Sequence, residues 1–459
     1  MLLKSDDCKG THDHLSKFTI LNQPFYKTNF MRINLKIIGI SVLLMLSTNI
    51  MGQKKLNSLP QINIGANVNN MQKIYLSQFT DNVRYLPLEF SQDNPIGMIK
   101  SITFSEKYIL INDIKTCLLY DIKGHFIRNI GKRGRGPGEY QFLTCSRLNN
   151  DRIYIQSVFD LFKYKTDGSF VRKIKNRFMF NNSTYQYTRN WIIINDSLFF
   201  SHMPNPTGNI QNKALLTNND GEIIKPFKNH ILFHREKPIA STDDNAHISQ
   251  YAKIIYFKEY YNDTLFYLDS QYKLIPKYVF NLGKYKEPVA VREKPLAELG
   301  KSQANFIFIP NVFQTDKYLF IKCQFGDHFP AKRLTPETVI LPDGNVIERW
   351  YNTKNALGIY KKDAKTISFC EPTSTDNPLF TSGIYNDIDA GPRFLPDMQL
   401  NDSTMVMWIK PSDLKKHIKN IDFRNIVLKY PEKKKHLEEL ANKLNELDNP
   451  VLMFVTFKK

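Results

Sequence analysis

The chain has 459 residues, of which 42% are hydrophobic and 13% aromatic, and its formal net charge is +19. This composition excludes a disordered or collagen-like chain and leaves room for one large domain or two ordinary ones. The excess of positive charge favours anionic partners, such as acidic glycans or lipid head groups. A solvated basic surface without a specific partner is an equally good interpretation of it.

Residues 31–52 have the three parts of a secretory signal peptide. Arg32 and Lys36 supply the positive charge, residues 37–46 are an uninterrupted apolar run, and a polar segment ends in Gly52. The apolar run is shorter than the roughly 20 residues of a membrane span, although an uncleaved anchor is the alternative. We predict cleavage after Gly52, which removes three net positive charges and leaves +16.

The predicted signal peptide also decides the start and the compartment of the protein. Residues 1–30 precede it without an evident role, so we interpret them as an upstream extension from a start codon assigned too early, with Met31 as the true start. No cysteine stands directly after the apolar run, in residues 47–53, and a lipid-attachment cysteine is therefore missing. We expect a periplasmic or extracellular protein that is not lipid-anchored, is monomeric and keeps no membrane span.

After a lead-in over residues 53–80, a strand–turn–strand unit recurs along the chain. In each unit a polar turn built on Asp or Gly joins two apolar strands, which is typical of β-hairpins. The units start 43, 54, 49 and 94 residues apart, close to the period of propeller blades with four short strands each. They occupy residues 118–130, 161–174, 215–227, 264–280 and 358–369.

The last spacing is about twice the others and predicts one degenerate blade, with a strand at 317–325. Apolar strands are also predicted at both ends, at 82–89 and 450–457. We therefore predict an all-β fold, a six-bladed β-propeller over residues 81–459 in which the two terminal strands share a blade and close the ring. One helix is expected at about 431–447, with proline in its first turn and leucines on one face.

Several motifs occur in order along the chain. They are GKRGRGPGEY at 131–140, segments 88–102 and 263–284, NDIDAGPRFLP at 386–396 and DNPVLM at 448–453. Together they resemble a secreted six-bladed β-propeller family of bacterial envelope proteins and lipoproteins, the NHL/TolB-like propellers with GPGEY and NDIDGG-type motifs. The resemblance implies an exported propeller. Ala390 departs from it, because the family tends to have glycine there.

The glycine-rich loop is the first candidate site. Lys132, Arg133 and Arg135 surround backbone amides that could receive an anion. No helix or Gly-Lys-Ser/Thr sequence follows, so the loop does not fit a nucleotide-phosphate loop. Glu139 and Tyr140 are expected to hold the loop against a neighbouring blade and are secondary ligand-binding candidates.

Asn386, Asp387 and Asp389 form a second cluster, with three oxygen-bearing side chains within four positions. They are weak candidates for a Ca²⁺ site, because the remaining ligands of a recognised calcium loop are missing. Turns in which Asn and Asp bond their own backbone are the favoured interpretation. We otherwise expect no cofactor.

Trp191 and Trp350 are candidate stacking surfaces for a glycan, if they lie exposed in rim loops; buried, they belong to the core. Four cysteines follow the signal peptide, and their wide spacing fits neither a zinc site nor a dense disulfide framework. A bridge between Cys117 and Cys145 and buried thiols are both open. The histidines form no metal-binding motif on a helix.

Three functions remain in order of preference. The first is an exported, non-catalytic propeller that binds a glycan, a peptide or an envelope protein through one rim. The second is a propeller hydrolase or lyase with a polar or metal-bearing central channel, which would draw its ligands from several blades. The third is a scaffold. A nucleic-acid partner is not expected.

Overall fold

The computed structural model describes residues 59–157, 159–179, 186–195, 197–235, 246–328, 337–340, 346–349, 355–372, 382–420, 423, 428 and 430–458. The chain divides into two units, residues 1–58 and 59–459, and the fold below is that of the second. The predicted signal peptide and upstream extension lie outside the described residues.

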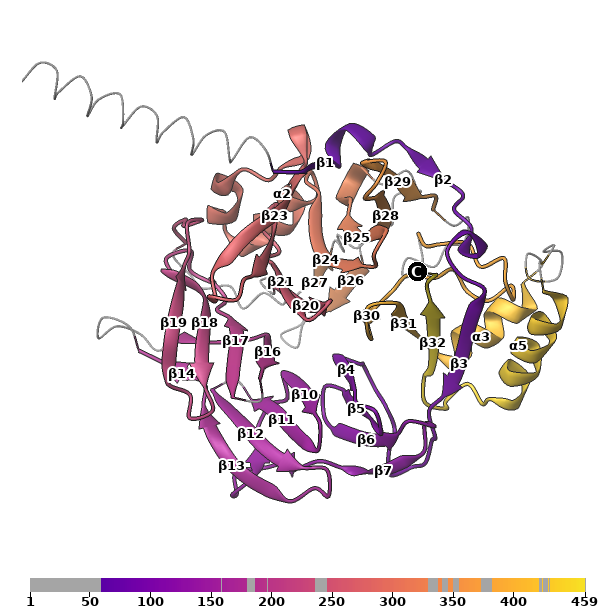
Figure 1. Cartoon of the computed structure of the whole chain (residues 1–459), viewed down its shortest axis with the longest axis horizontal. Coiled ribbons are helices and arrows are strands. Elements are labelled where there is room, and N and C mark those ends of the chain that lie inside the picture. The colour runs from indigo at the N-terminus through magenta and orange to yellow at the C-terminus, as the bar shows by residue number, and fades with distance from the viewer. Residues whose placement is uncertain are drawn as a thin grey trace, which may run out of the picture. The chain divides into compact units, whose positions relative to one another are not determined.

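Six antiparallel blades succeed one another around a central axis, in chain order from β4 onward (Figure 1). The first three have four strands each. Blade 1 contains β4 (Ser101–Phe104), β5 (Tyr108–Asn112), β6 (Cys117–Asp121) and β7 (Phe126–Asn129). Blade 2 contains β10 (Cys145–Asn149), β11 (Arg152–Ser157), β12 (Asp160–Lys165) and β13 (Phe170–Lys175). Blade 3 contains β16 (Trp191–Ile194), β17 (Leu198–His202), β18 (Asn212–Asn218) and β19 (Ile223–Lys228).

The other three blades each include a strand from the N-terminal segment, which is a fifth strand in blades 4 and 5 and the fourth strand in blade 6. Blade 4 contains β20 (His247–Tyr251), β21 (Ile254–Lys258), β22 (Thr264–Leu268) and β23 (Leu274–Asn281), with β1 (Gln61–Asn63) added in parallel. Blade 5 contains β24 (Phe308–Gln314), β25 (Tyr318–Gln324), β28 (Asn355–Lys361) and β29 (Thr366–Cys370), with β2 (Met71–Gln72) added in parallel. Blade 6 contains β30 (Met398–Gln399), β31 (Thr404–Ile409), β32 (Val451–Thr456) and β3 (Asn82–Pro87).

The predicted six-bladed propeller is thus confirmed, and the recurring units are the third and fourth strands of blades 1 to 5. Their turn chemistry explains why the sequence revealed them. In blade 1, Asp121 Oδ1 accepts the backbone N–H of Lys123 at 2.8 Å and of His125 at 2.9 Å. Gly124 supplies the positive φ of 88° that the turn requires.

The prediction of a degenerate blade was wrong. β25 and β28 are neighbours in one sheet, so residues 317–325 and 358–369 belong to the same blade. Two insertions lengthen the interval instead. One precedes β24 and holds η3 (Gly283–Tyr285), η4 (Val289–Glu293) and α2 (Leu296–Gln303); the other holds η5 (Gly326–His328), β26 (Glu337–Ile340) and β27 (Val346–Arg349).

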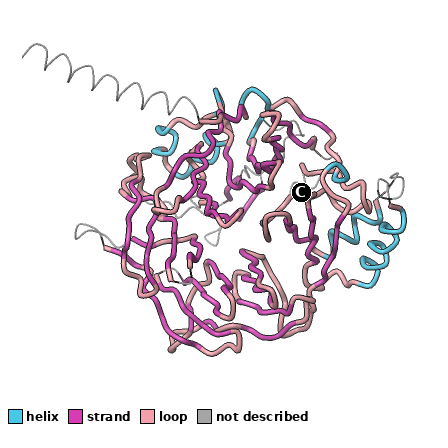
Figure 2. Tube along the Cα trace, viewed as in Figure 1, coloured by secondary structure: helices cyan, strands magenta, loops and turns pink. Residues whose placement is uncertain are grey.

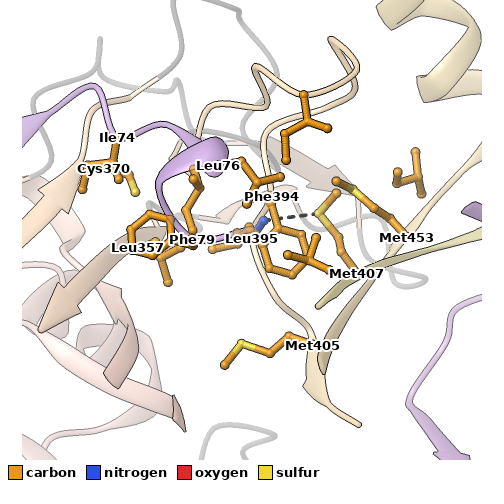
Figure 3. Packing of buried hydrophobic residues seen from close by; sticks show 14 of the residues in the cluster. Ile74, Leu76, Phe79, Leu357, Cys370, Phe394, Leu395, Met405, Met407 and Met453 are labelled. Carbon is orange, nitrogen blue, oxygen red and sulfur yellow. Dashed lines mark hydrogen bonds between the residues drawn. The ribbon is translucent and has the colours of Figure 1, made fainter. Parts of the chain in front are cut away.

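The ring closes in blade 6, where β3 pairs with the last strand, β32. β32 lies between β31 and β3 and pairs antiparallel with both, from Asn82 opposite Thr456 to Pro87 opposite Val451. Residues before β3, including η1 (Gly65–Asn67) and η2 (Leu76–Gln78), run along the outer strands of blades 4 to 6. A large buried cluster joins Leu76 and Phe79 from this segment to Phe394, Met407 and Met453 (Figure 3).

Two α-helices, α3 and α5, lie beside blade 6, and α2 lies in the insertion before β24 (Figure 2). α5 (Pro431–Lys443) begins where predicted and ends earlier, and Leu447 beyond it is 85% exposed. A second helix before it, α3 (Pro411–Lys419), was not predicted. It is short and rich in lysine, so its apolar positions, Leu414 and Ile418, are too few to reveal it in the sequence.

Three small two-stranded pairs complete the described strands. They are β8 (Lys132–Arg133) with β9 (Glu139–Tyr140), β14 (Arg177–Phe178) with β15 (Gln186–Tyr187), and β26 with β27. The first pair is parallel and closes the predicted glycine-rich loop on itself.

Candidate functional site

The innermost strands of all six blades bound a cavity of about 1030 Å³ along the propeller axis. Its wall is made by β4, β10, β16, β20, β24 and β30 and by the turns that follow several of them. We call this cavity the channel. No single stretch of sequence builds it, because most of the wall comes from the first strand of each blade and a neighbouring turn. Blade 6 adds Trp408 of β31 and two residues after β32, Phe457 and Lys458.

Neutral hydrogen-bonding groups and aromatic faces share the channel wall. Phe104, Tyr251 and Trp408 are partly buried aromatic side chains there. Amides and hydroxyls come from every blade: Ser101, Thr103, Asn149, Asn190, Ser249, Gln250, Thr315, Gln399, Asn401 and Ser403. Such a wall can stack against an apolar ring face and hydrogen-bond the groups around it.

Arg147 of β10 is the half-buried cation of the wall. Its Nε donates to the carbonyl of Trp191 at 3.3 Å, its Nη1 to the carbonyl of Ser146 at 3.0 Å, and its Nη2 to Asn190 Oδ1 at 2.9 Å. Asn190 is itself fixed, because its Nδ2 donates to the carbonyl of Ala246 at 2.9 Å. The guanidinium is therefore held between blades 2 and 3 by neutral acceptors.

Two of the three carboxylates of the wall are engaged elsewhere, and the third, Asp316, is exposed. Asp397 accepts Lys322 Nζ at 3.4 Å and the backbone N–H of Trp408 at 3.2 Å. Asp402 accepts the backbone N–H of Ala252 at 2.8 Å, which ties the first turns of blades 6 and 4 together. Burial raises the pKa of Asp397, and the neighbouring Lys322 opposes that shift.

His247 is the histidine in the channel wall. Burial lowers the pKa of its imidazole to about 4, so the ring is neutral at physiological pH. Its Nδ1 lies 3.0 Å from the amide nitrogen of Asn311, which donates to it, and the ring packs edge-on against Phe313. These contacts make it a fixed neutral group of the wall.

The glycine-rich loop does bind a carboxylate, but the carboxylate is its own. Glu139 Oε2 accepts the backbone N–H of Gly136 at 2.8 Å, and Oε1 lies 3.1 Å from Lys132 Nζ. These hydrogen bonds, that of Gly136 first, lower the pKa of Glu139. A Cβ on Gly134 would lie 1.9 Å from Glu139 Oε2, so a side chain at this position would displace the carboxylate. We had expected Glu139 to hold the loop against a neighbouring blade. Its hydrogen bond and its ion pair instead close its own loop.

Tyr140 is 2% exposed and packs with apolar residues of blades 1 and 2, which fits the structural role predicted for it. Arg133 and Arg135 are exposed. A groove of about 710 Å³ runs beside the loop, lined by Arg135 and by three partly exposed phenylalanines, Phe142, Phe159 and Phe170. Of the three predicted basic residues, Arg135 lines this groove, and none of the three lines the channel.

Trp191 is a core residue. It is 2% exposed, packs edge-on against Tyr154 and Phe199, and donates from Nε1 to Gln156 Oε1 at 2.8 Å. It is therefore not a stacking surface for a ligand. Trp350 lies outside the described residues.

We expect Trp191→Phe to lower the free energy of unfolding by about 1–3 kcal/mol, because Gln156 keeps a buried acceptor without its donor. Urea unfolding followed by circular dichroism measures this change. Phe199→Leu, in the same cluster, is the matched packing control without a lost hydrogen bond. An unchanged unfolding midpoint for Trp191→Phe would contradict the assignment to the core.

Asn386, Asp387 and Asp389 form a clasp between blade 6 and the N-terminal segment. Asp387 accepts the backbone N–H of Ser77 at 2.9 Å and its hydroxyl at 2.5 Å. Asp389 Oδ1 accepts Tyr85 Oη at 3.2 Å, Asn386 Nδ2 at 2.7 Å and the backbone N–H of Gly391 at 2.8 Å. Ala390 takes the left-handed conformation, with φ of 60°, where the resembling family tends to have glycine.

Protein donors thus occupy the oxygens of this cluster, as in the turn that we favoured. Among the residues that the structure describes, no group of His, Cys, Asp or Glu side chains is arranged to hold a metal ion. A bound Ca²⁺ stays an untested prediction. The cysteines Cys117, Cys145, Cys323 and Cys370 are all buried free thiols, so the bridge between Cys117 and Cys145 is absent.

Comparison with protein-family models gives one match, over residues 59–456, to a domain of unknown function, DUF4934. The chain belongs to the DUF4934 family. The matched range begins just before β1 and ends with β32, so the DUF4934 domain comprises the whole ring together with the segment that closes it.

Two solved structures share the propeller fold of this DUF4934 chain. BF0058 of Bacteroides fragilis NCTC 9343, which its name gives as an exported protein, has 16% identity and a TM-score of 0.59, covering 88% of this chain and 100% of its own. A member of the DUF4221 family from Bacteroides vulgatus ATCC 8482 has 12% identity and a TM-score of 0.50, covering 83% and 97%. A comparison with curated proteins gave no significant match.

In the described part of the DUF4934 chain, no helix is long and apolar enough to cross a membrane. The channel residues of this domain, Arg147 and Asn190 among them, were missed by the sequence analysis. Most channel residues, including Arg147 and Asn190, belong to or adjoin the first strand of a blade, whereas the recognised units are the third and fourth strands. Short segments with alternating polar residues upstream of each unit were the available signal.

Proposed function

We propose that this DUF4934 chain is an exported, non-catalytic propeller that binds a carbohydrate in its channel. The observation that carries the proposal is the channel wall, where amides and hydroxyls from all six blades surround partly buried aromatic faces. A pyranose ring presents apolar C–H faces and a rim of hydroxyls, which are the two chemistries of that wall. A peptide or an envelope protein on a rim is the other form of this function.

Export is supported by the predicted signal peptide at 31–52 and by the name of the structural neighbour BF0058. The closer relationship to NHL- and TolB-like envelope propellers is likewise part of the proposal, and the six-bladed ring agrees with it. A periplasmic or extracellular location without a lipid anchor follows from the same segment.

The enzyme alternative needs a general acid or base in the channel. Among the described wall residues, His247 accepts a hydrogen bond from Asn311 and has its pKa lowered to about 4 by burial, which does not favour proton transfer near neutral pH. The carboxylates of the wall are Asp397, paired with Lys322, Asp402, bound to the backbone of Ala252, and Asp316; in the described part of the chain none of them is hydrogen-bonded to His247. The structure therefore gives this alternative no specific support, and binding is the function that we pursue.

The test is a thermal-shift screen of residues 53–459 with neutral and acidic saccharides, acidic and neutral peptides, divalent cations and EDTA. A ligand that binds the folded state raises the melting temperature by mass action. We expect saccharides to give the shifts. A shift with peptides alone would overturn the proposed ligand class, and a large loss of stability with EDTA would favour the metal-bearing alternative.

Two matched variants locate the site of any saccharide hit. Gln250→Trp places an indole at an exposed position of the channel, and Gln141→Trp places one at an exposed position of the groove beside the glycine-rich loop. We expect the first to weaken binding at least tenfold, because the indole fills the space of the ligand, and the second to leave it within twofold. The reverse pattern would move the site to the groove.

A further inference from the structure

The positive charge of Arg147 in the channel wall lies 5.9 Å from the centre of the Trp191 ring and is not hydrogen-bonded to a carboxylate. Its three hydrogen bonds all go to neutral oxygens, two backbone carbonyls and the amide of Asn190. A partly buried guanidinium loses hydration, and a neutral acceptor returns less of that energy than an anion does. The half-buried position of Arg147 therefore favours a negatively charged group beside it.

The hydrogen-bonding capacity of the guanidinium points to the same conclusion. Arginine has five N–H donors, one on Nε and two on each terminal nitrogen. The three bonds account for the Nε hydrogen and for one hydrogen on each terminal nitrogen. Each terminal nitrogen thus retains a second hydrogen, and these hydrogens can be donated to a carboxylate.

The surrounding charges leave this position open to an anion. Asp397 is balanced by Lys322, at 3.4 Å, Asp402 is engaged by the backbone of Ala252, and Asp316 is exposed. Three exposed cations also line the wall: Lys100, Lys253 and Lys458. His247 is neutral at physiological pH, because burial lowers its pKa, and it does not repel a cationic or anionic group.

Asn190 fixes the direction of the guanidinium. Its Oδ1 accepts both Arg147 Nη2 and the backbone N–H of Trp191, each at 2.9 Å, while its Nδ2 is bound to the carbonyl of Ala246. All the polar atoms of this amide are used, so it cannot rotate away without losing bonds. Asn190 is accordingly a positioning residue for Arg147.

We propose that Arg147, oriented by Asn190, binds the carboxylate of an acidic sugar in the channel. This assignment rests on the proposed function and adds the charge of the ligand to it. The ligand class is a uronic acid or a saccharide that contains one, because the neutral part of the wall suits a sugar ring and the guanidinium suits its carboxylate.

The experiment compares sodium galacturonate and an oligogalacturonate with galactose and the matching neutral oligosaccharide. Binding is measured by calorimetry at constant ionic strength on residues 53–459, with sodium sulfate as a simple anion. The variants are Arg147→Gln, Arg147→Lys and the control Arg135→Gln, which removes an equal charge from the groove. The melting temperature of each ligand-free variant shows whether it is folded.

We expect the acidic saccharides to bind at least tenfold more tightly than their neutral counterparts. Arg147→Gln should abolish that preference, Arg147→Lys should retain part of it, and Arg135→Gln should change it less than twofold. Equal losses for Arg135→Gln and Arg147→Gln would overturn the proposal, since surface charge alone would explain the preference. Tighter binding of sulfate than of galacturonate would also overturn the carboxylate assignment.

The two proposals fail in different ways. If neutral saccharides bind as well as acidic ones, and Gln250→Trp abolishes both, the channel function holds and the role of Arg147 is wrong. If neither neutral nor acidic saccharides bind the wild-type protein at about 10 mM, both the saccharide class and the carboxylate site are refuted.

Discussion

A chain that ends at Pro450, and so lacks the closing strand β32, should not fold cooperatively. β32 is the shared neighbour of β31 and β3, and its side chains Val451, Leu452, Met453 and Val455 are completely buried. Without it, β3 has no partner in blade 6. Blade 6 also loses the apolar side chains that pack against its two neighbours, blades 5 and 1. Burial of large apolar side chains contributes about 2 kcal/mol each, so the loss of these four, about 8 kcal/mol, is comparable with the whole stability of an ordinary domain.

The measurement is circular dichroism during thermal unfolding, with calorimetry as the check of cooperativity. A chain that ends at Phe457 is the matched control, since it keeps β32 and loses only the exposed end with the ion pair between Lys458 and Asp81. The control should melt within a few degrees of the full chain. A cooperative transition in the chain that ends at Pro450 would show that β32 does not close the ring.

Asp389→Ala should lower the free energy of unfolding by about 3–5 kcal/mol. Asp389 is 2% exposed, and its Oδ1 accepts three donors, Tyr85 Oη, Asn386 Nδ2 and the backbone N–H of Gly391. Alanine leaves Tyr85 Oη and the N–H of Gly391 without this acceptor, and Asn386 Nδ2 keeps only Tyr85 Oη, at 3.4 Å; each donor that water cannot reach costs about 1–3 kcal/mol. Urea unfolding of the two proteins measures the difference.

Tyr85→Phe is the companion variant for this clasp, because it removes one of the three donors and keeps the acceptor. It should cost about 1 kcal/mol, well below the loss for Asp389→Ala. Equal, small effects of the two substitutions would mean that the clasp does not hold β3 to the segment around Asp389.

The pH dependence of the same residue provides a separate readout. Burial raises the pKa of Asp389 from its ordinary 3.8 to about 6 in the folded chain. Between these two values the unfolded chain has released the proton and the folded chain keeps it, so the contribution of Asp389 to stability falls as pH rises through this window and is constant above it. Asp389→Asn should lack this fall, which is on the order of 3 kcal/mol.

Much of the fold could be predicted because its local chemistry is explicit. Asp and Gly at hairpin turns, as in Asp121 and Gly124, specify the joint between the third and fourth strands of a blade, and the terminal strands pair as expected. The insertions around blade 5 were misinterpreted as a degenerate blade. Spacing alone cannot distinguish an additional blade from an insertion between two strands of one sheet.

The channel could not be predicted, because its members meet only when the ring closes. Arg147 and Asn190 lie in adjacent blades, and their neighbours in sequence give no sign that their side chains bond to each other. The glycine-rich loop shows the opposite case. Its backbone amide at Gly136 and its cations were recognised as an anion site, but the anion is supplied by Glu139 three residues away.

A crystal structure of residues 53–459 with the tightest-binding saccharide of the screen would show directly whether the channel is the binding site. We predict density for the sugar in the channel, with its ring against an aromatic face of the wall and its carboxylate beside Arg147. Density in the groove of the glycine-rich loop, against Phe142 or Phe159, with none in the channel, would contradict it.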